Sequence, residues 1–164
     1  MELLKRLKDR APEYDDKYFD MILNFTTEQG SGMGRSTEEE RWKQGKYFST
    51  RYEMYMYATL LGLKKDYRLS IPKGTKTSKF IEIKSWQPID VSDYVIMGVL
   101  SKCDIDFNDL ENMEDDDVEK KLTEIKGVLE EYANGGFDII ESKLKEEPSF
   151  FSQNDNCFLD LLDE

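Results

Sequence analysis

VEKKLTEIKGVLEEYANGGFDIIESKLK, residues 118–145, combines a helical apolar pattern with a glycine pair. In its first half, apolar side chains recur every three or four residues, the spacing of one helical face: Leu122, Ile125, Val128, Leu129 and Tyr132. Asn134-Gly135-Gly136 is typical of a helix end, and a second helical pattern ends before Pro148. The stretch therefore predicts two helices, over residues 118–133 and 137–145, with a turn between them.

Similar patterns occur nearer the N-terminus. Residues 1–29 predict two helices, one on either side of Pro12. Residues 52–63 carry one apolar stripe and predict another helix. Residues 94–100 are apolar nearly all round, so the helix that contains them is expected to be the central core helix.

A different period appears in the middle of the chain. Apolar and polar side chains alternate over residues 67–71, and a second short apolar run covers residues 80–83. The intervening PKGTKTSK, residues 72–79, is rich in turn-forming residues. This pattern predicts two short strands joined by a loop, and a two-stranded ribbon of this kind is stable only when it packs on helices.

The length of 164 residues suits one domain with a real core. The expected fold is mainly α: a single compact helical domain over residues 1–148, with a small two-stranded β ribbon. Residues 1–46 are a candidate N-terminal extension, and residues 149–164 form an acidic-hydrophobic C-terminal tail. No apolar run is long enough to span a membrane, and no secretory signal is recognisable, so a cytoplasmic location is expected.

The chain contains no histidine, which removes imidazole-based catalysis and the common zinc hydrolase motifs. Its two cysteines, Cys103 and Cys157, form no CxxC motif, so a disulfide scaffold or thiolate zinc site is not expected. No cofactor or metal is predicted, and a non-enzymatic protein is favoured over an enzyme.

The glycine-rich stretch QGSGMGRST, residues 29–37, resembles a P-loop motif but differs from it at two positions. Gln29 stands where a P-loop has glycine, and Arg35 stands where it has lysine. The segment before it looks helical rather than like a buried strand. A loop that joins two helices is therefore favoured over a nucleotide site.

A second candidate is a magnesium-dependent nuclease of the PD-(D/E)xK kind. Glu82 and Lys84 would share one face of a strand, with Asp66 near the start of the preceding strand. In such enzymes two carboxylates hold the metal and a lysine polarises the attacking water. Any amphipathic strand with charged outward residues matches this short pattern, so a solvated strand face is the favoured interpretation.

Charge is distributed unevenly along the chain. Residues 1–88 carry 17 basic and 13 acidic side chains, whereas residues 89–164 carry 6 basic and 22 acidic ones. The basic excess peaks over residues 41–84, where 11 basic side chains are interleaved with aromatic ones. Such a combination suits DNA, although the lysines could instead balance the acidic half. The candidate DNA-binding residues are Lys64, Lys65, Arg68, Lys73, Lys76 and Lys79.

The acidic half offers candidate contacts for a protein partner. Nine carboxylates and no basic residue lie between Asp104 and Glu119, without the residue order of a calcium-binding EF-hand loop. They favour either a solvated loop or a surface that imitates the DNA backbone. The tail sequence FLDLLDE could dock in a partner's groove or fold back on its own domain. The candidate partner-binding residues are Asp115, Asp116, Asp117, Phe158, Leu159 and Leu162.

Three segments resemble a known family. They are YFSTRYEMYMYATLLGLKKDYRLSIP from residue 47, IDVSDYVIMGVLSKC from residue 89 with the DLENM that follows, and EEYANGGFDIIESKL from residue 130. They are similar to small accessory proteins associated with bacterial DNA phosphorothioation (Dnd) systems and related phage-defence loci. The resemblance implies work beside a DNA-modifying or DNA-cleaving complex, and it implies no catalytic residues.

The favoured hypothesis is a non-enzymatic accessory protein of a DNA-modification or defence system. It would bind DNA through its basic middle and a protein partner through its acidic half. The alternatives are an acidic DNA-mimic inhibitor and the nuclease described above. The sequence leaves open the identity of the partner and the oligomeric state.

Overall fold

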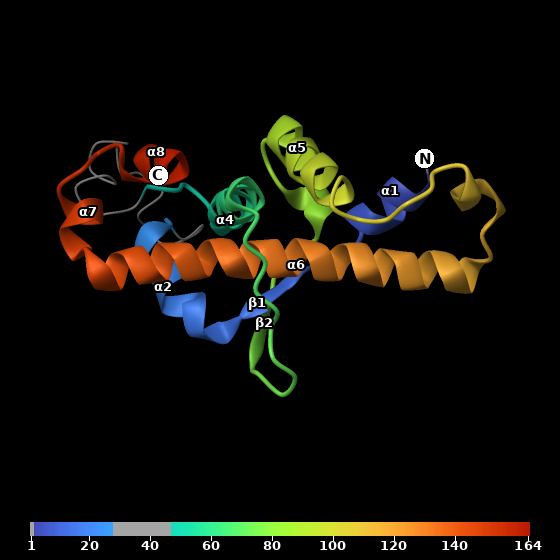
Figure 1. The fold of residues 1–164 in the computed structure, drawn as a ribbon, viewed down its shortest axis with the longest axis horizontal. Helices are drawn as coiled ribbons and strands as arrows, with labels where there is room; N and C mark the ends of the chain where they lie inside the picture. The colour runs from blue at the N-terminus through green and yellow to red at the C-terminus, as the bar shows by residue number, and fades with distance from the viewer. Residues whose placement is uncertain (1, 28–46) are drawn as a thin grey trace.

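A computed structural model describes residues 2–27 and 47–164. Helix α6 (Asp115–Glu146) runs along the length of the molecule, and the other elements lie along it (Figure 1). In chain order, the described elements are α1 (Glu2–Lys8), β1 (Glu13–Asp15), η1 (Asp16–Tyr18), α2 (Phe19–Phe25), α4 (Arg51–Lys65), β2 (Thr77–Lys79), η3 (Ile83–Ser85), α5 (Ile89–Leu100), η4 (Asp109–Asn112), α6, α7 (Pro148–Ser152) and α8 (Cys157–Asp163). The predicted mainly α class with a small two-stranded sheet is confirmed.

Helix α6 is continuous across Asn134-Gly135-Gly136, so the predicted helix end there is wrong. A glycine inside a helix costs only about 1 kcal/mol, which tertiary packing can outweigh. Here α4 crosses α6 so closely that a Cβ on Gly136 would lie 1.8 Å from the carbonyl oxygen of Ala58. Likewise, a Cβ on Gly62 of α4 would lie 2.2 Å from the carbonyl oxygen of Tyr132. The missing side chains therefore permit a close helix crossing rather than a helix end.

The segment that follows α4 is bonded to α6 instead of forming a strand. The amide of Leu69 donates to the carbonyl of Glu131 at 3.1 Å. Its own carbonyl accepts from Nδ2 of Asn134, which is buried, at 3.0 Å. Both backbone groups of Leu69 form hydrogen bonds to α6 instead of to a neighbouring strand. The predicted strand over residues 67–71 is therefore wrong.

The observed ribbon joins two segments that are distant in the sequence. Strand β1 pairs antiparallel with β2, with Glu13 opposite Lys79 and Asp15 opposite Thr77. The second predicted strand, over residues 80–83, is also wrong, because the chain turns into η3 after β2. The ribbon lies against α6, where the amide of Glu13 donates to the Glu130 carboxylate at 3.2 Å.

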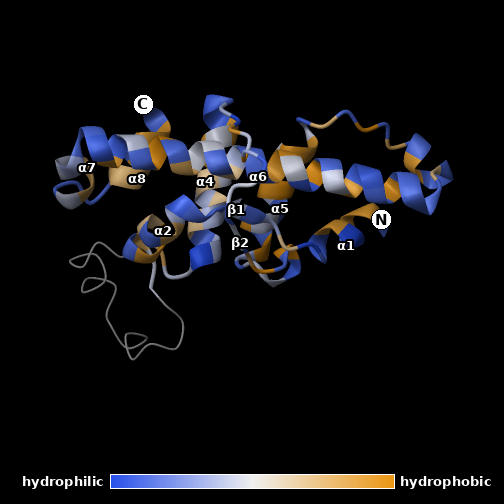
Figure 2. Ribbon diagram, turned by 90° about the horizontal axis from the view of Figure 1, so that it is seen from below, coloured by the Kyte–Doolittle hydropathy of each residue, from blue (hydrophilic) through white to orange (hydrophobic). Residues whose placement is uncertain are grey.

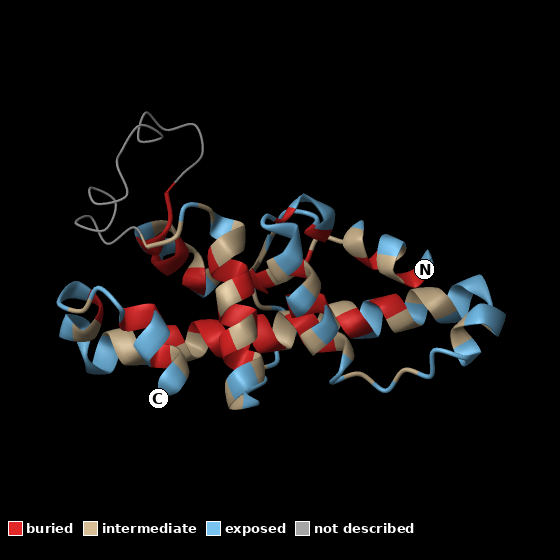
Figure 3. Cartoon of the chain, turned by 90° about the horizontal axis from the view of Figure 1, so that it is seen from above, coloured by how far each residue is buried: buried red, intermediate tan, exposed pale blue. Residues whose placement is uncertain are grey.

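The core lies between α4, α6 and the elements beside them. Figure 3 shows buried residues along the middle of α6 and on the α4 segment that crosses it. Helix α5 contributes only one face: Val95 and Val99 are buried, whereas the side chains of Tyr94 and Met97 are 70% and 65% exposed. The expectation that α5 is the central core helix is therefore wrong, and α6 holds that position.

Both ends of the chain pack onto the same body. Helices α1 and α2 confirm the two helices predicted on either side of Pro12. Near the C-terminus, the ring of Phe158 in α8 lies 5.3 Å from that of Phe25 in α2, centroid to centroid. The C-terminal segment is therefore folded back on its own domain. The P-loop-like stretch at residues 29–37 lies outside the described residues.

Candidate nucleic-acid interface

The loop that leads into β2, residues 72–76, projects away from α6 and is the green loop at the bottom of Figure 1. The amide of Thr75 donates to the carbonyl of Pro72 at 3.1 Å and closes a turn. Gly74 within this turn has a φ of 82°, a conformation that side-chain-bearing residues rarely adopt. The turn thereby presents Lys73 and Lys76 to solvent.

Among the described residues, two of the three lysines in residues 72–79 have no carboxylate partner: Lys73 on the turn and Lys79 in strand β2. In the described part of the chain, Lys73 and Lys79 form no ion pair, and both are exposed. Lys76 lies 3.2 Å from a carboxylate oxygen of Asp16, measured from its Nζ atom. The hydroxyl of Ser78 also donates to Asp16, and this hydrogen bond, helped by Lys76, lowers the pKa of the Asp16 carboxyl. Asp16 thus offsets part of the charge of the loop.

Lys17 adds a fourth cation that sequence reasoning missed. The amide of Asp16 donates to the carbonyl of Lys76 at 3.0 Å, so the chain at Lys17 is held beside the loop. Lys17 is exposed, with its Nζ 4.9 Å from the ring centroid of Tyr18. No local pattern could have revealed this, because the residues are brought together only by the pairing of β1 with β2.

The other three predicted DNA-binding residues lie elsewhere. Lys64 pairs with Asp163 at 3.3 Å. Arg68 pairs with Glu131 at 2.6 Å, and the hydrogen bond to Glu131 raises the pKa of its guanidinium group. Lys65 lines a shallow groove between α4, α6 and α8. The basic middle therefore does not form one patch, and part of its charge is neutralised by the acidic half.

The structure places the residues of the nuclease hypothesis in two separate networks. Asp66 accepts hydrogen bonds from Lys102 at 2.9 Å and from the hydroxyl of Tyr132 at 3.0 Å, and both interactions lower the pKa of its carboxyl. Lys84 instead pairs with Glu82 at 2.9 Å and Asp9 at 3.1 Å. These two carboxylates raise the pKa of the Lys84 amine.

Because η3 occupies the position of the expected strand, Glu82 and Lys84 do not share a strand face. No three potential metal-ligating side chains gather anywhere in residues 2–27 and 47–164. Asp66 therefore shares no hydrogen bond or ion pair with Glu82 or Lys84 in the described structure.

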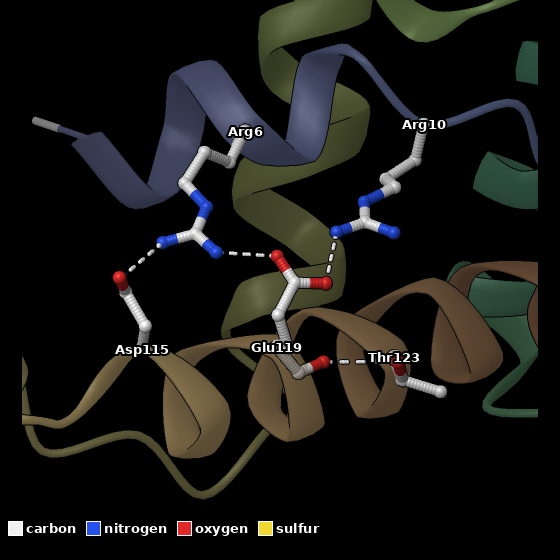
Figure 4. A network of polar contacts seen from close by, with 5 residues as sticks. All are labelled: Arg6, Arg10, Asp115, Glu119 and Thr123. Atoms are coloured by element: carbon white, nitrogen blue, oxygen red, sulfur yellow. Dashed lines mark hydrogen bonds and ion pairs between the residues drawn. The ribbon is translucent and has the colours of Figure 1, made fainter.

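At the acidic end, two arginines hold the start of α6 against α1 (Figure 4). Arg6 and Arg10 each donate to one carboxylate oxygen of Glu119, and Arg6 also pairs with Asp115 at 3.2 Å. The hydrogen bonds from Arg6 and then Arg10 lower the pKa of the Glu119 carboxyl. This network fixes α1 onto the first turns of α6.

Among the described residues, most of the other carboxylates in the connection between α5 and α6 and in the first turn of α6 form no ion pair with lysine or arginine. Asp117 pairs with Lys120 at 2.8 Å, while Asp116 is exposed. Figure 2 shows the ribbon coloured mostly hydrophilic where α6 begins. Within the described residues, the exposed carboxylates of this end that form no ion pair are Asp104, Asp106, Asp109, Glu111, Glu114 and Asp116.

The predicted partner-binding residues of the tail differ in exposure. Phe158 is only 8% exposed and packs among other aromatic rings, whereas Leu159 is 64% exposed. Leu162 is partly buried against the core. Of the three, Leu159 alone presents a largely exposed side chain.

No helix in the described ranges has both the length and the apolar character that a membrane crossing needs. A family profile described as "DNA sulphur modification system-associated protein 4" matches residues 33–161, which is most of the chain. The match confirms the resemblance to Dnd-associated accessory proteins. No curated protein and no solved structure gives a significant match.

Proposed function

The chain belongs to the family of DNA sulphur modification system-associated protein 4, and on this premise we propose that it is an accessory protein that contacts DNA through its projecting loop. The observation that carries the proposal is the exposure of Lys73 and Lys79 without carboxylate partners among the described residues. Lys73 on the protruding turn, with Lys79 on the strand that follows it, can approach the phosphates of a duplex while the acidic body stays away from it.

The expected contact is with the phosphate backbone. Lysine acts as a point charge on phosphate, and Thr75 adds a hydroxyl group to the loop. No side chain of the loop has the bidentate geometry by which arginine or asparagine reads base edges. The binding should therefore be weak and independent of sequence, since the whole chain carries a net charge of -12. An accessory protein held near DNA by a larger complex can use such a contact.

Fluorescence anisotropy with a short labelled duplex at several salt concentrations tests the proposal. The logarithm of the affinity should fall against the logarithm of salt concentration with a slope of about -3, as expected for three to four neutralised phosphates. The double variant Lys73→Glu, Lys79→Glu should lose most of the binding.

The matched control is Lys120→Glu with Lys145→Glu, which changes the charge equally on exposed positions of α6. Thermal unfolding verifies that all variants are folded. Equal loss of DNA binding in both double variants would show that the change in net charge, and not the position of the lysines, weakens DNA binding. Binding that is unchanged in the loop variant would refute the proposed contact.

A further inference from the structure

A cleft of about 400 Å³ opens where α1, η4 and the start of α6 meet. This volume lies within the roughly 300–1,000 Å³ that ligand pockets span. Leu3 and Val118 line it from the two helices, and Leu110 and Met113 line it from the connection between α5 and α6. Phe107 also lines the cleft, and its side chain is 50% exposed. The cleft therefore has an apolar part, beside which polar side chains make up much of the rest of its surface.

The charged groups around this cleft are predominantly negative. Its lining includes the carboxylates of Glu2, Glu111 and Asp115. Arg6 is the one cation of the lining, and it is already paired with Asp115 and Glu119. Further carboxylates without cations lie on the same connection and on the first turn of α6: Asp104, Asp106, Asp109, Glu114 and Asp116. A ligand for this cleft must therefore be apolar in its centre and positive at its edges.

Contacts within the chain hold two walls of the cleft in place. Arg6 and Arg10 clamp Glu119 and so hold α1 against α6, which fixes two of the walls (Figure 4). Thr123 adds a local bond by donating from its hydroxyl to the Glu119 carbonyl at 2.9 Å. A preformed groove loses less conformational entropy on binding than one that must first be ordered.

We propose that this cleft docks a basic amphipathic helix of a protein partner, an inference that rests on the accessory role proposed above but not on DNA contact. Apolar side chains at helical spacing would enter between Leu3, Phe107 and Met113, as in other helix-in-groove complexes. Lysine or arginine on the flanks of that helix would meet the unpaired carboxylates and so select the partner. DNA lacks this complementarity, and a second copy of this chain would bring a further net charge of -12 to the acidic end.

The test uses two synthetic helical peptides with the same leucine stripe. One carries lysine on both flanks of the stripe, and the other carries glutamate. Each is titrated into the isotope-labelled full chain and followed by amide NMR and by fluorescence anisotropy. The lysine peptide should bind, with the largest shifts at Leu3, Met113 and Val118, and the glutamate peptide should not.

Two cleft variants separate docking from general charge attraction. Phe107→Ser removes a half-exposed apolar side chain from the cleft, and Asp109→Asn with Glu111→Gln removes two negative charges. Each variant should lower the affinity for the lysine peptide about tenfold. The controls are Ile81→Ser and Asp20→Asn with Asp155→Asn, which alter exposed residues elsewhere and should leave the affinity unchanged.

Equal affinity for wild type and Phe107→Ser would overturn the proposal, because simple charge attraction would then explain the binding. Shifts centred on the exposed Tyr94 and Met97 of α5 would also overturn it. The DNA measurements provide an independent readout. Cleft variants should bind DNA like the wild type. A wild type that binds DNA but not the lysine peptide would show that the docking proposal has failed, and one that binds the peptide but not DNA would show that the proposed DNA contact has failed.

Discussion

Replacement of Gly136 by alanine should destabilise the protein, although alanine is the better helix former. The new Cβ would lie 1.8 Å from the carbonyl oxygen of Ala58, whereas real Cβ contacts are essentially never shorter than 3.0 Å. One helix must therefore move by about 1.2 Å, the difference between these two distances. Overpacking of this kind costs up to about 3 kcal/mol. Because alanine has a higher helix propensity than glycine, the substitution also stabilises the helix by about 1 kcal/mol. The net loss is then roughly 2 kcal/mol.

Gly127 provides a control in the same helix. A Cβ at that position meets no atom within 4 Å, so Gly127→Ala should raise the free energy of unfolding by up to about 1 kcal/mol. Urea unfolding of wild type and both variants, followed by far-ultraviolet circular dichroism, measures the two changes. If both alanines stabilise the protein equally, the close approach of α4 and α6 does not exist in solution, and the explanation of the glycine pair is wrong.

Two further predictions concern the ends of the molecule. Because Arg6 and Arg10 lower the pKa of the Glu119 carboxyl, its contribution to stability is present above its unfolded pKa of about 4.3 and is lost as the pH falls through its folded pKa. Glu119→Gln should therefore lower the melting temperature near pH 7 but much less near pH 3, and an equal difference at both pH values would contradict this. Phe158→Ala should cost about 3–5 kcal/mol in urea unfolding, and Leu159→Ala less than about 0.5 kcal/mol. Similar losses for both would show that α8 does not pack as described.

The helices were predictable because their apolar spacing is local. The face that begins at Leu122 is buried as predicted, and so are Val128 and Tyr132 on it. The glycine pair after this face misled the prediction because a glycine can either end a helix or allow another backbone to approach. Only the position of Ala58, which is distant in the sequence, distinguishes the two roles. Local pattern therefore predicted that helices exist, but not how they cross.

Long-range pairing also explains the errors at the candidate sites. Strand β2 was missed because its partner, β1, lies near the N-terminus and carries no strong alternation of its own. Charge counts predicted a basic middle and an acidic half, but not that Arg68 would pair with Glu131. Lys73 lies on a turn as predicted, because Pro72 and Gly74 are local turn signals, whereas Lys79 lies in β2 rather than in the predicted loop.

The two proposed surfaces are attached to one helix, and this constrains how they could be used together. The ribbon that carries the basic loop is bonded to α6 at Glu130, and the acidic cleft includes Asp115 at the start of α6. Fifteen residues separate these two positions. At about 1.5 Å of rise per residue, they lie roughly 22 Å apart along the helix axis. A partner docked in the cleft would therefore be held at a fixed distance from a bound duplex, because a continuous helix cannot bend freely between them. This geometry requires α6 to remain unbroken at Gly127, which lies between the two surfaces and where a Cβ would meet no atom within 4 Å.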